Sequence, residues 1–292
     1  MQIEGDDPGW NGSWAILQQP DFAAVMAKHL LWRVESCGPL LALVERRPVV
    51  GAVRAIVGSP ETAGPPERWE PALAALGAGS LRLLTNRRVD ALEPHRISGD
   101  DEYSYLVPLA PSENEIFAGF ESRCRRNIRS ARKAGVFARP GRVGEEFDAA
   151  WEMIRSTSED GRAFELPKRE FVREVLDLPC GRFYVAEQAG RLVGCTVALA
   201  HGHLEAWIAG FDREAKPLPA ALLYWEIMRL ARAENLSHFD FGPQSISGNP
   251  SLTLFKRSFS PVLRPFRLYD VRRGWRGAAV SLGERILHRV RR

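Results

Sequence analysis

The sequence predicts an α/β protein with two similar halves, each built around a mixed sheet. Its 292 residues exceed the usual size of one domain and suffice for two. Apolar residues make up 45% and charged residues 26%, as in globular proteins. Two segments, LLALVERRPVVGAV and FYVAEQAGRLVGCTV, each place a glutamate before a turn and Val-Gly after it. This self-similarity favours an internal duplication.

In the first half, periodicity and turn residues predict a helix, a hairpin, a short helix and two strands, in that order. The segment Gly58–Pro66 is rich in Gly and Pro and is predicted to be a loop. The helices are expected at Asp21–Trp32 and Glu67–Leu76, the hairpin strands at Leu40–Glu45 and Val49–Val57, and the later strands at Ser80–Asn86 and Tyr103–Leu109.

The second half repeats this order. Val193, Cys195, Val197 and Leu199 alternate as in a half-buried strand. Helices are expected at Glu145–Thr157, Lys168–Leu178 and Pro219–Glu234, hairpin strands at Arg182–Gln188 and Leu192–His201, and further strands at His203–Phe211 and His238–Phe241.

One long helix is predicted to join the halves. It begins at the capping-box pattern Ser112–Glu115 and ends at Gly135. Its predicted buried face consists of residues at helical spacing, namely Ile116, Phe120, Cys124, Ile128 and Ala131. On this stripe Cys124 is interpreted as a buried thiol rather than an activated thiolate.

Basic residues concentrate in two segments of a chain whose net charge is +4. Residues 123–142 carry a local charge of +8, and residues 272–292 carry +6. Such segments indicate an anionic partner, such as RNA, a phosphorylated donor or an anionic membrane, or else two solvated helix faces. The tail has Ala279, Leu282, Ile286 and Val290 on one helical face, which predicts a basic amphipathic helix.

Location is inferred from the cysteines and from the lack of targeting patterns. No stretch of 18 apolar residues occurs, and the acidic N-terminus has no secretory pattern. The four cysteines are far apart and form no disulfide framework or CxxC pair. We expect a cytoplasmic protein without a transmembrane segment.

Three sequence elements resemble the Fem-type aminoacyl transferases, a group with GNAT-like domains. They are RCRRNIRSARKAGV at Arg123–Val136, PAALLYWEIMRLARAENL at Pro219–Leu236, and FDFG with LTLFKRSFSP at Phe239–Pro261, where Ser260 replaces a family glycine. The resemblance covers roughly residues 103–270. It implies two tandem GNAT-like domains, at 1–140 and 141–271, followed by the tail 272–292, and it implies amide formation by acyl or aminoacyl transfer.

The resemblance also implies the catalytic candidates. Lys256 aligns with the family's F-K lysine and is expected to act as a catalytic or phosphate-contacting cation; the alternative is a surface lysine between two core phenylalanines. Asp240 is expected to hold the amine or to orient Lys256, or else to cap the next turn. Arg126 and Arg129 share a helix side and suit bidentate phosphate binding, or else form a solvated face.

Other candidates come from position along the chain. Arg213 and Lys216 are expected to assist donor binding, and Trp207, Tyr224 and Phe255 are expected to contact substrate. For His201 and His203 the sequence analysis finds no acidic or cysteine partner with metal-ligand spacing, and it predicts no metal site.

The donor is inferred from the loop Asp212–Trp225, which contains no glycine and in which Pro217 and Pro219 each lack an N–H. The loop is poor for a coenzyme A pyrophosphate. The resemblance to Fem-type enzymes, which take their acyl group from aminoacyl-tRNA, then implies transfer from aminoacyl-tRNA to the amine of a small acceptor, in specialised biosynthesis, without a tightly bound cofactor. Two alternatives stay open: an acyl-CoA-dependent N-acyltransferase, and a non-catalytic RNA- or lipid-binding module.

Overall fold

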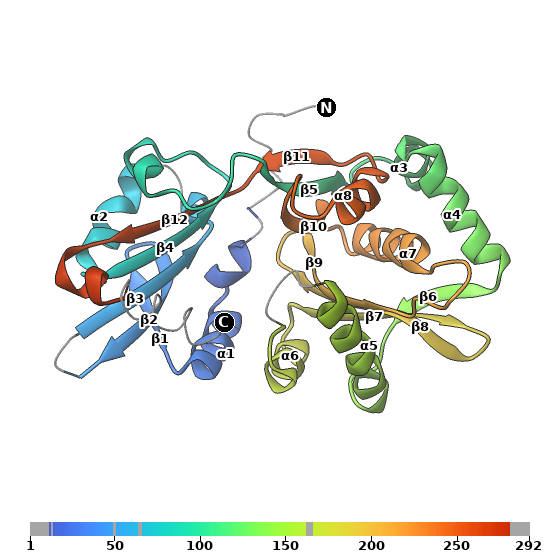
Figure 1. Ribbon diagram of the computed structural model, residues 1–292, viewed down its shortest axis with the longest axis horizontal. Coiled ribbons are helices and arrows are strands. Elements are labelled where there is room, and N and C mark those ends of the chain that lie inside the picture. The colour runs from blue at the N-terminus through green and yellow to red at the C-terminus, as the bar shows by residue number, and fades with distance from the viewer. Residues whose placement is uncertain (1–11, 13, 49–50, 64–65, 162–165, 281–292) are drawn as a thin grey trace. The chain divides into compact units, whose positions relative to one another are not determined.

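The structure, a computed structural model, describes residues 12, 14–48, 51–63, 66–161 and 166–280. They form two compact units (Figure 1). The seven-stranded unit spans Tyr103–Arg264. The five-stranded unit combines the described residues before Tyr103 with those from Pro265 onward.

The two units divide the chain differently from the expected segments 1–140, 141–271 and 272–292. The chain returns to the first sheet near its end, because β12 (Arg267–Arg272) pairs antiparallel with β4 (Ser80–Thr85). Residues 103–140 in turn belong to the seven-stranded unit. The compact units are thus interleaved in sequence, and the expected division into consecutive domains remains a prediction.

The five-stranded sheet has the order β1-β2-β3-β4-β12. Strands β1 (Arg33–Cys37), β2 (Leu40–Arg47) and β3 (Gly51–Gly58) are antiparallel neighbours, whereas β4 runs parallel to β3. Side chains from the strands pack with Trp69 and Leu73 to form its core. The helical segments are α1 (Pro20–Leu30), α2 (Glu70–Ala75) and short 3-10 helices at Ala15–Gln18, Pro60–Ala63, Pro66–Arg68 and Asp90–His95.

The seven-stranded sheet has the order β11-β5-β10-β9-β8-β7-β6. Strands β6 to β9 are antiparallel neighbours, and β10 then runs parallel to β9. The strands are β5 (Glu102–Pro108), β6 (Val136–Pro140), β7 (Gly181–Gln188), β8 (Arg191–Ala200), β9 (Leu204–Phe211), β10 (His238–Ser245) and β11 (Val262–Pro265).

Helices cover both faces of this sheet. Figure 1 shows α4 and α7 on one side and α5 and α6 on the other. Along β7, Tyr184 and Ala186 enter one core while Phe183 and Val185 enter the second, as the period of two in a strand requires. The helices are α3 (Glu113–Gly119), α4 (Ser122–Lys133), α5 (Glu145–Gly161), α6 (Arg169–Leu176), α7 (Ala220–Ala233) and α8 (Pro250–Arg257).

The structure confirms the α/β class with mixed sheets, and it confirms both predicted hairpins, as β2–β3 and β7–β8. Several elements were not predicted from the sequence: besides short 3-10 helices, these are β1, β6, α8, β11 and β12.

The single connecting helix was wrong, because the segment forms two helices, α3 and α4. Phe120, between them, has extended backbone angles of −65° and 151°. Its buried ring lies 5.5 Å from the Trp225 ring and 5.1 Å from the Phe259 ring. Packing with these distant residues accompanies the break between α3 and α4. The predicted capping box of Ser112 and Glu115 is confirmed at the start of α3.

The predicted tail helix is described only in part. Residues 274–280 are helical and Val280 is buried, whereas Leu282, Ile286 and Val290 lie outside the described residues. Within the described parts of the chain, every helix is too short or too polar to span a lipid bilayer.

Candidate active site

Three charged side chains are buried together where β9 and β10 meet. The sheet register places Glu205 of β9 beside Asp240 of β10, and Lys256 comes from α8. Their exposed fractions are 5%, 0% and 6%. Charged residues are rarely buried without a partner, so this grouping is a candidate site rather than ordinary core. We call Glu205, Asp240 and Lys256 the charged cluster.

The backbone diverges next to this cluster. Strands β9 and β10 are paired at only two positions, of which Glu205 and Asp240 are the second. Gly242 follows with a φ of +75°, a conformation that glycine adopts without steric cost. Its N–H donates to Asp240 Oδ1 at 2.7 Å, and its carbonyl accepts from Lys256 Nζ at 3.2 Å. Gly242 thus connects the acid to the lysine.

Local sequence explains how α8 presents its lysine. Asn249 caps the helix by accepting from the Leu252 N–H, and Pro250 occupies the first turn. Thr253 and Lys256, three residues apart, form the buried face. The Lys256 ammonium lies 5.2 Å from the centre of the Tyr105 ring, in cation–π geometry.

Burial dominates the electrostatics of the cluster. It lowers the pKa of Lys256 to about 8, although Asp240 and Glu205 act in the opposite direction. Burial also raises the pKa of Glu205 well above its ordinary value, against the effect of Lys256. A lysine of this kind is charged at neutral pH yet loses its proton more readily than an exposed lysine.

Both predicted catalytic residues therefore lie in the charged cluster. Lys256 is buried, which contradicts the alternative of a surface lysine. Asp240 makes the turn contact to Gly242 and also lies near Lys256. The turn contact is therefore present, and the catalytic role stays a prediction. Glu205 was missed, although an acid within the apolar run HLEAWIAG was a usable signal.

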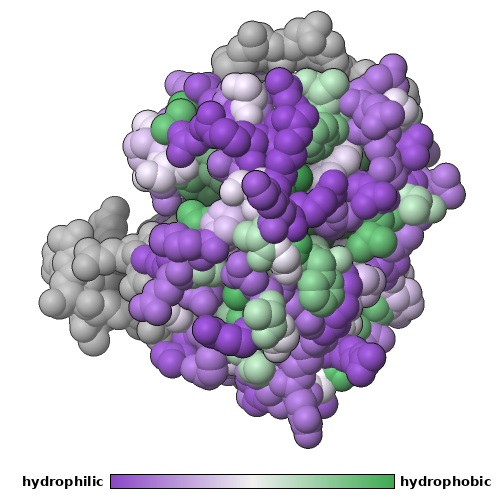
Figure 2. Space-filling view, turned by 90° about the vertical axis from the view of Figure 1, so that its right-hand side faces the viewer, coloured by the Kyte–Doolittle hydropathy of each residue, from purple (hydrophilic) through white to green (hydrophobic). Residues whose placement is uncertain are grey.

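The predicted arginine pair lies apart from this cluster. Arg126 and Arg129 are exposed on α4. Helix α4 lies on the right in Figure 1, and Figure 2 shows that this side of the molecule is mostly hydrophilic. The Arg129 guanidinium carbon is 5.4 Å from the centre of the Phe117 ring. Helix α4 meets α8 only near its start, where the Glu121 N–H donates to the Ser258 carbonyl at 2.9 Å. Within the described residues no contact joins either arginine to Lys256.

Arg213 and Lys216 are exposed in the loop between β9 and α7. Lys216 Nζ donates to the Arg213 carbonyl at 3.4 Å. Helix α7 begins directly after Pro219, and no side chain caps it. An uncapped helix N-terminus beside two cations favours an anionic group.

The three predicted substrate-contacting residues separate into two groups. Tyr224 packs with Phe255, ring centres 5.7 Å apart, in the core that α7 covers, and burial raises the pKa of Tyr224 to about 12. Trp207 packs instead on Phe171 of α6, at 5.6 Å, beside the core on the opposite face. Trp207 therefore does not share a site with Tyr224 and Phe255.

Cys124, His201 and His203 are also buried. Burial raises the pKa of Cys124 to about 11, which agrees with an inert buried thiol. Burial lowers the pKa of His201 to about 4, so its imidazole is neutral. From the sequence, no acidic or cysteine partner with metal-ligand spacing was expected for His201 and His203, but the structure places Glu205 next to both.

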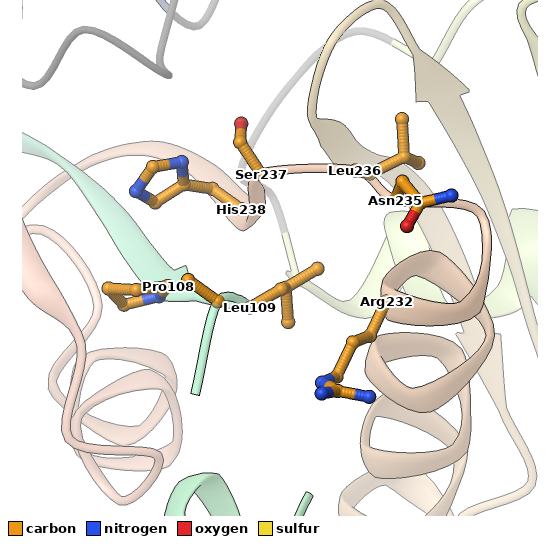
Figure 3. A pocket seen from close by; sticks show the side chains of 8 residues that line it. Pro108, Leu109, Arg232, Asn235, Leu236, Ser237 and His238 are labelled. Atoms are coloured by element: carbon orange, nitrogen blue, oxygen red, sulfur yellow. The ribbon is translucent and has the colours of Figure 1, made fainter. Parts of the chain in front are cut away.

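A pocket of about 470 Å³ opens at the end of α7 (Figure 3). Its lining includes none of the residues that were predicted from the sequence to bind the donor or substrate or to act in catalysis. Its walls come from the segment that follows β5, the end of α7 and the start of β10, namely Pro108, Leu109, Ala110, Arg232, Asn235, Leu236, Ser237 and His238. His238 lies near enough to His203 to depress that residue's pKa. The pocket thus neighbours the histidines, not Lys256.

Comparisons with known proteins agree with this fold. Residues 118–250 match the family model described as an acetyltransferase (GNAT) domain. No curated protein sequence matches the chain. The structure is similar to that of FemX, at 13% identity and a TM-score of 0.68, over 88% of this chain and 92% of FemX.

Two further structures are similar, each at 13% identity. One is the C-terminal domain of a putative lysylphosphatidylglycerol synthetase from Agrobacterium fabrum, with a TM-score of 0.58 over 93% of this chain and 94% of that one. The other is L-PGS from Bacillus licheniformis, with a TM-score of 0.54 over 88% and 93%. At this identity the likenesses show the fold. Together with the matched acetyltransferase domain, they show a GNAT-like α/β fold whose two mixed sheets are consistent with tandem GNAT-like domains.

Proposed function

We propose that the protein transfers an aminoacyl group from aminoacyl-tRNA to the amine of a small acceptor. The observation that carries the proposal is the charged cluster of Glu205, Asp240 and Lys256, buried at the divergence of β9 and β10 in the GNAT domain. The resemblance to Fem-type transferases, and a FemX-like fold over most of the chain, favour the aminoacyl donor.

The reaction requires stabilisation of a tetrahedral oxyanion. The acceptor nitrogen attacks the ester carbonyl, the C–N bond forms, and the C–O bond to the tRNA ribose breaks. The amine proton leaves with the ribose hydroxyl. We assign the Lys256 ammonium to the oxyanion, because a cation in a dry site stabilises developing charge far better than one in water. Asp240, held by the Gly242 N–H, keeps Lys256 charged and oriented.

Donor binding is assigned to the exposed cations. We assign contacts with phosphates of the RNA backbone to Arg126 and Arg129, which are exposed on α4, because binding of RNA relies on such side chains. The loop before α7 offers little for a pyrophosphate, because it has no glycine and Pro217 and Pro219 donate no hydrogen bond.

An acyl-CoA-dependent N-acyltransferase is the second candidate. The match to the GNAT acetyltransferase model favours it, as does the uncapped start of α7 beside Arg213 and Lys216. Tyr224 and Phe255 are assigned to the acceptor in either case. The four free cysteines favour a cytoplasmic location.

A donor competition separates the two candidates. The full chain is incubated with labelled aminoacyl-tRNA or labelled acetyl-CoA, each with the same panel of amines. We expect amide product from the charged tRNA and its loss after ribonuclease treatment. Transfer from acetyl-CoA that ribonuclease does not affect would replace the leading proposal by the second. Binding of RNA or lipid without product from either donor would indicate a non-catalytic module.

A further inference from the structure

Two histidines and a glutamate converge at the turn between β8 and β9. His201 and His203 lie in the turn, and Glu205 is the second residue of β9. Each offers one ligand atom, and these three atoms lie within 4.8 Å of one another. His201 Nε2 is 3.6 Å from Glu205 Oε2, and the two imidazole centres are 4.1 Å apart.

These groups are buried, and some lack hydrogen-bond partners. The His201 side chain is 1% exposed and that of Glu205 is 7% exposed. Within the described residues neither ring nitrogen of His201 has a hydrogen-bond partner, and neither has Glu205 Oε2. A buried polar group left in this state destabilises the folded protein. A ligand at this point would remove that destabilisation.

We propose that His201, His203 and Glu205 bind a divalent transition-metal ion, with Zn²⁺ as the representative. Two imidazoles and one carboxylate are a ligand set that Zn²⁺ uses, whereas Mg²⁺ and Ca²⁺ prefer oxygen ligands. Ligands about 2 Å from zinc at tetrahedral angles lie roughly 3.3 Å apart, and His201 Nε2 and Glu205 Oε2 are 3.6 Å apart here.

The backbone around these residues is already organised. The His201 N–H donates to the His203 carbonyl at 2.9 Å, and Gly202 has a φ of +90°. The Ser237 N–H donates to the Gly202 carbonyl at 3.0 Å, which joins the turn to the start of β10.

Charge near the site is compatible with a cation. Lys256 opposes it, but Asp240, which pairs with Glu205 in the sheet, supplies a second acidic group. An ion here would fix Glu205 next to Asp240 and Lys256, beside the proposed catalytic cluster. Metal binding itself does not depend on the donor or on the proposed reaction.

The test measures metal directly on the full chain. The protein is incubated with ZnSO₄, desalted in the presence of a weak chelator to remove loosely bound zinc, and assayed for zinc content. In a separate sample Co²⁺ is bound instead, and its visible absorption is recorded. We expect about one tightly held ion per chain, with Co²⁺ bands of a nitrogen- and oxygen-ligated site and a higher melting temperature.

Two conservative variants and one control define the ligands. His201→Gln and Glu205→Gln keep side-chain volume and should lower affinity by at least roughly 10-fold, the loss seen even for residues that only support a ligand. The exposed His95→Ala should bind as the wild type does. If folded wild-type protein retains neither zinc nor cobalt, the proposal is overturned. Unchanged affinity in Glu205→Gln overturns it as well, even if His201→Gln fails to fold.

Discussion

The two sheets place a parallel strand pair after antiparallel strands, yet they use it differently. In the five-stranded unit, β3 and β4 pair at five positions, and the charged members Arg54 and Arg82 are only half-buried. In the seven-stranded unit, β9 and β10 pair at two positions, and the second pair consists of the buried acids Glu205 and Asp240. The β3–β4 pair is a regular part of its sheet, whereas β9 and β10 separate beside buried charged residues.

Buried acids in the two units also differ in their partners. Asp270, in the five-stranded unit, accepts from Ser80 Oγ at 2.9 Å and from Arg272 at 2.7 Å. Glu205 Oε2 has no hydrogen-bond partner within the described residues. A satisfied acid indicates a structural role, whereas an unsatisfied one indicates a site awaiting a ligand or substrate. The proposed chemistry therefore belongs to the seven-stranded unit.

The largest expected effect is on Lys256. Lys256→Met keeps a long side chain but removes the cation, and it should lower acyl transfer by roughly 100-fold or more, as loss of an oxyanion donor does. The matched control is Arg82→Met, in the parallel pair of the five-stranded unit, which should stay within about twofold. A thermal melt of each variant separates lost chemistry from lost folding. Full activity of folded Lys256→Met would make the charged cluster structural.

The second prediction concerns Asp270, the buried acid of the five-stranded unit. Asp270→Ala removes the partner of Ser80 and of Arg272, and it should destabilise the protein by about 1–3 kcal/mol. Turnover by the folded fraction should not change. Urea unfolding followed by tryptophan fluorescence gives the stability, and initial rates below the unfolding transition give the turnover. A fall in turnover without lost stability would place part of the site in the five-stranded unit.

The third prediction concerns pH. Asp240 on β10, Glu205 on β9 and the Tyr105 ring on β5 face the lysine, whose pKa is about 8 because burial disfavours its charge. A catalytic cation is lost as pH rises through this value, so the rate should fall about tenfold per pH unit above it. Hydroxylamine as acceptor keeps its own nitrogen unprotonated across this range. A rate that instead rises through pH 8 would make Lys256 a base.

The sequence predicted strands where alternation is local, as in both hairpins, because burial on one face repeats every second residue. It could not predict the end of α3. Phe120 continues the apolar stripe at helical spacing, and its extended backbone accompanies packing with Trp225 and Phe259, residues more than 100 positions away.

The candidate site was predicted in part for the same reason. Lys256 and Asp240 belong to short motifs, but their neighbour Glu205 is brought in by sheet register across 35 residues. The sequence does contain a local signal for α8, because Asn249 caps the helix and Pro250 occupies its first turn. The helix was not predicted, since the expectation for this segment rested on its resemblance to a motif. Residues placed by register or by tertiary packing leave no local pattern in a single sequence.

The smallest expected effect concerns the exposed arginines of α4, which test whether the donor crosses this surface. Arg129→Ala should raise the KM for aminoacyl-tRNA a few-fold and reduce the slope of its salt dependence by about one, as loss of one phosphate contact does. Arg126→Ala should act less strongly, because Arg129 is held over Phe117 and loses less freedom on binding. Arg88→Ala in the five-stranded unit, where Arg88 pairs with Asp90, is the control. An unchanged salt slope in both α4 variants would exclude this face from tRNA binding, and it would leave the cations before α7 as the donor contacts.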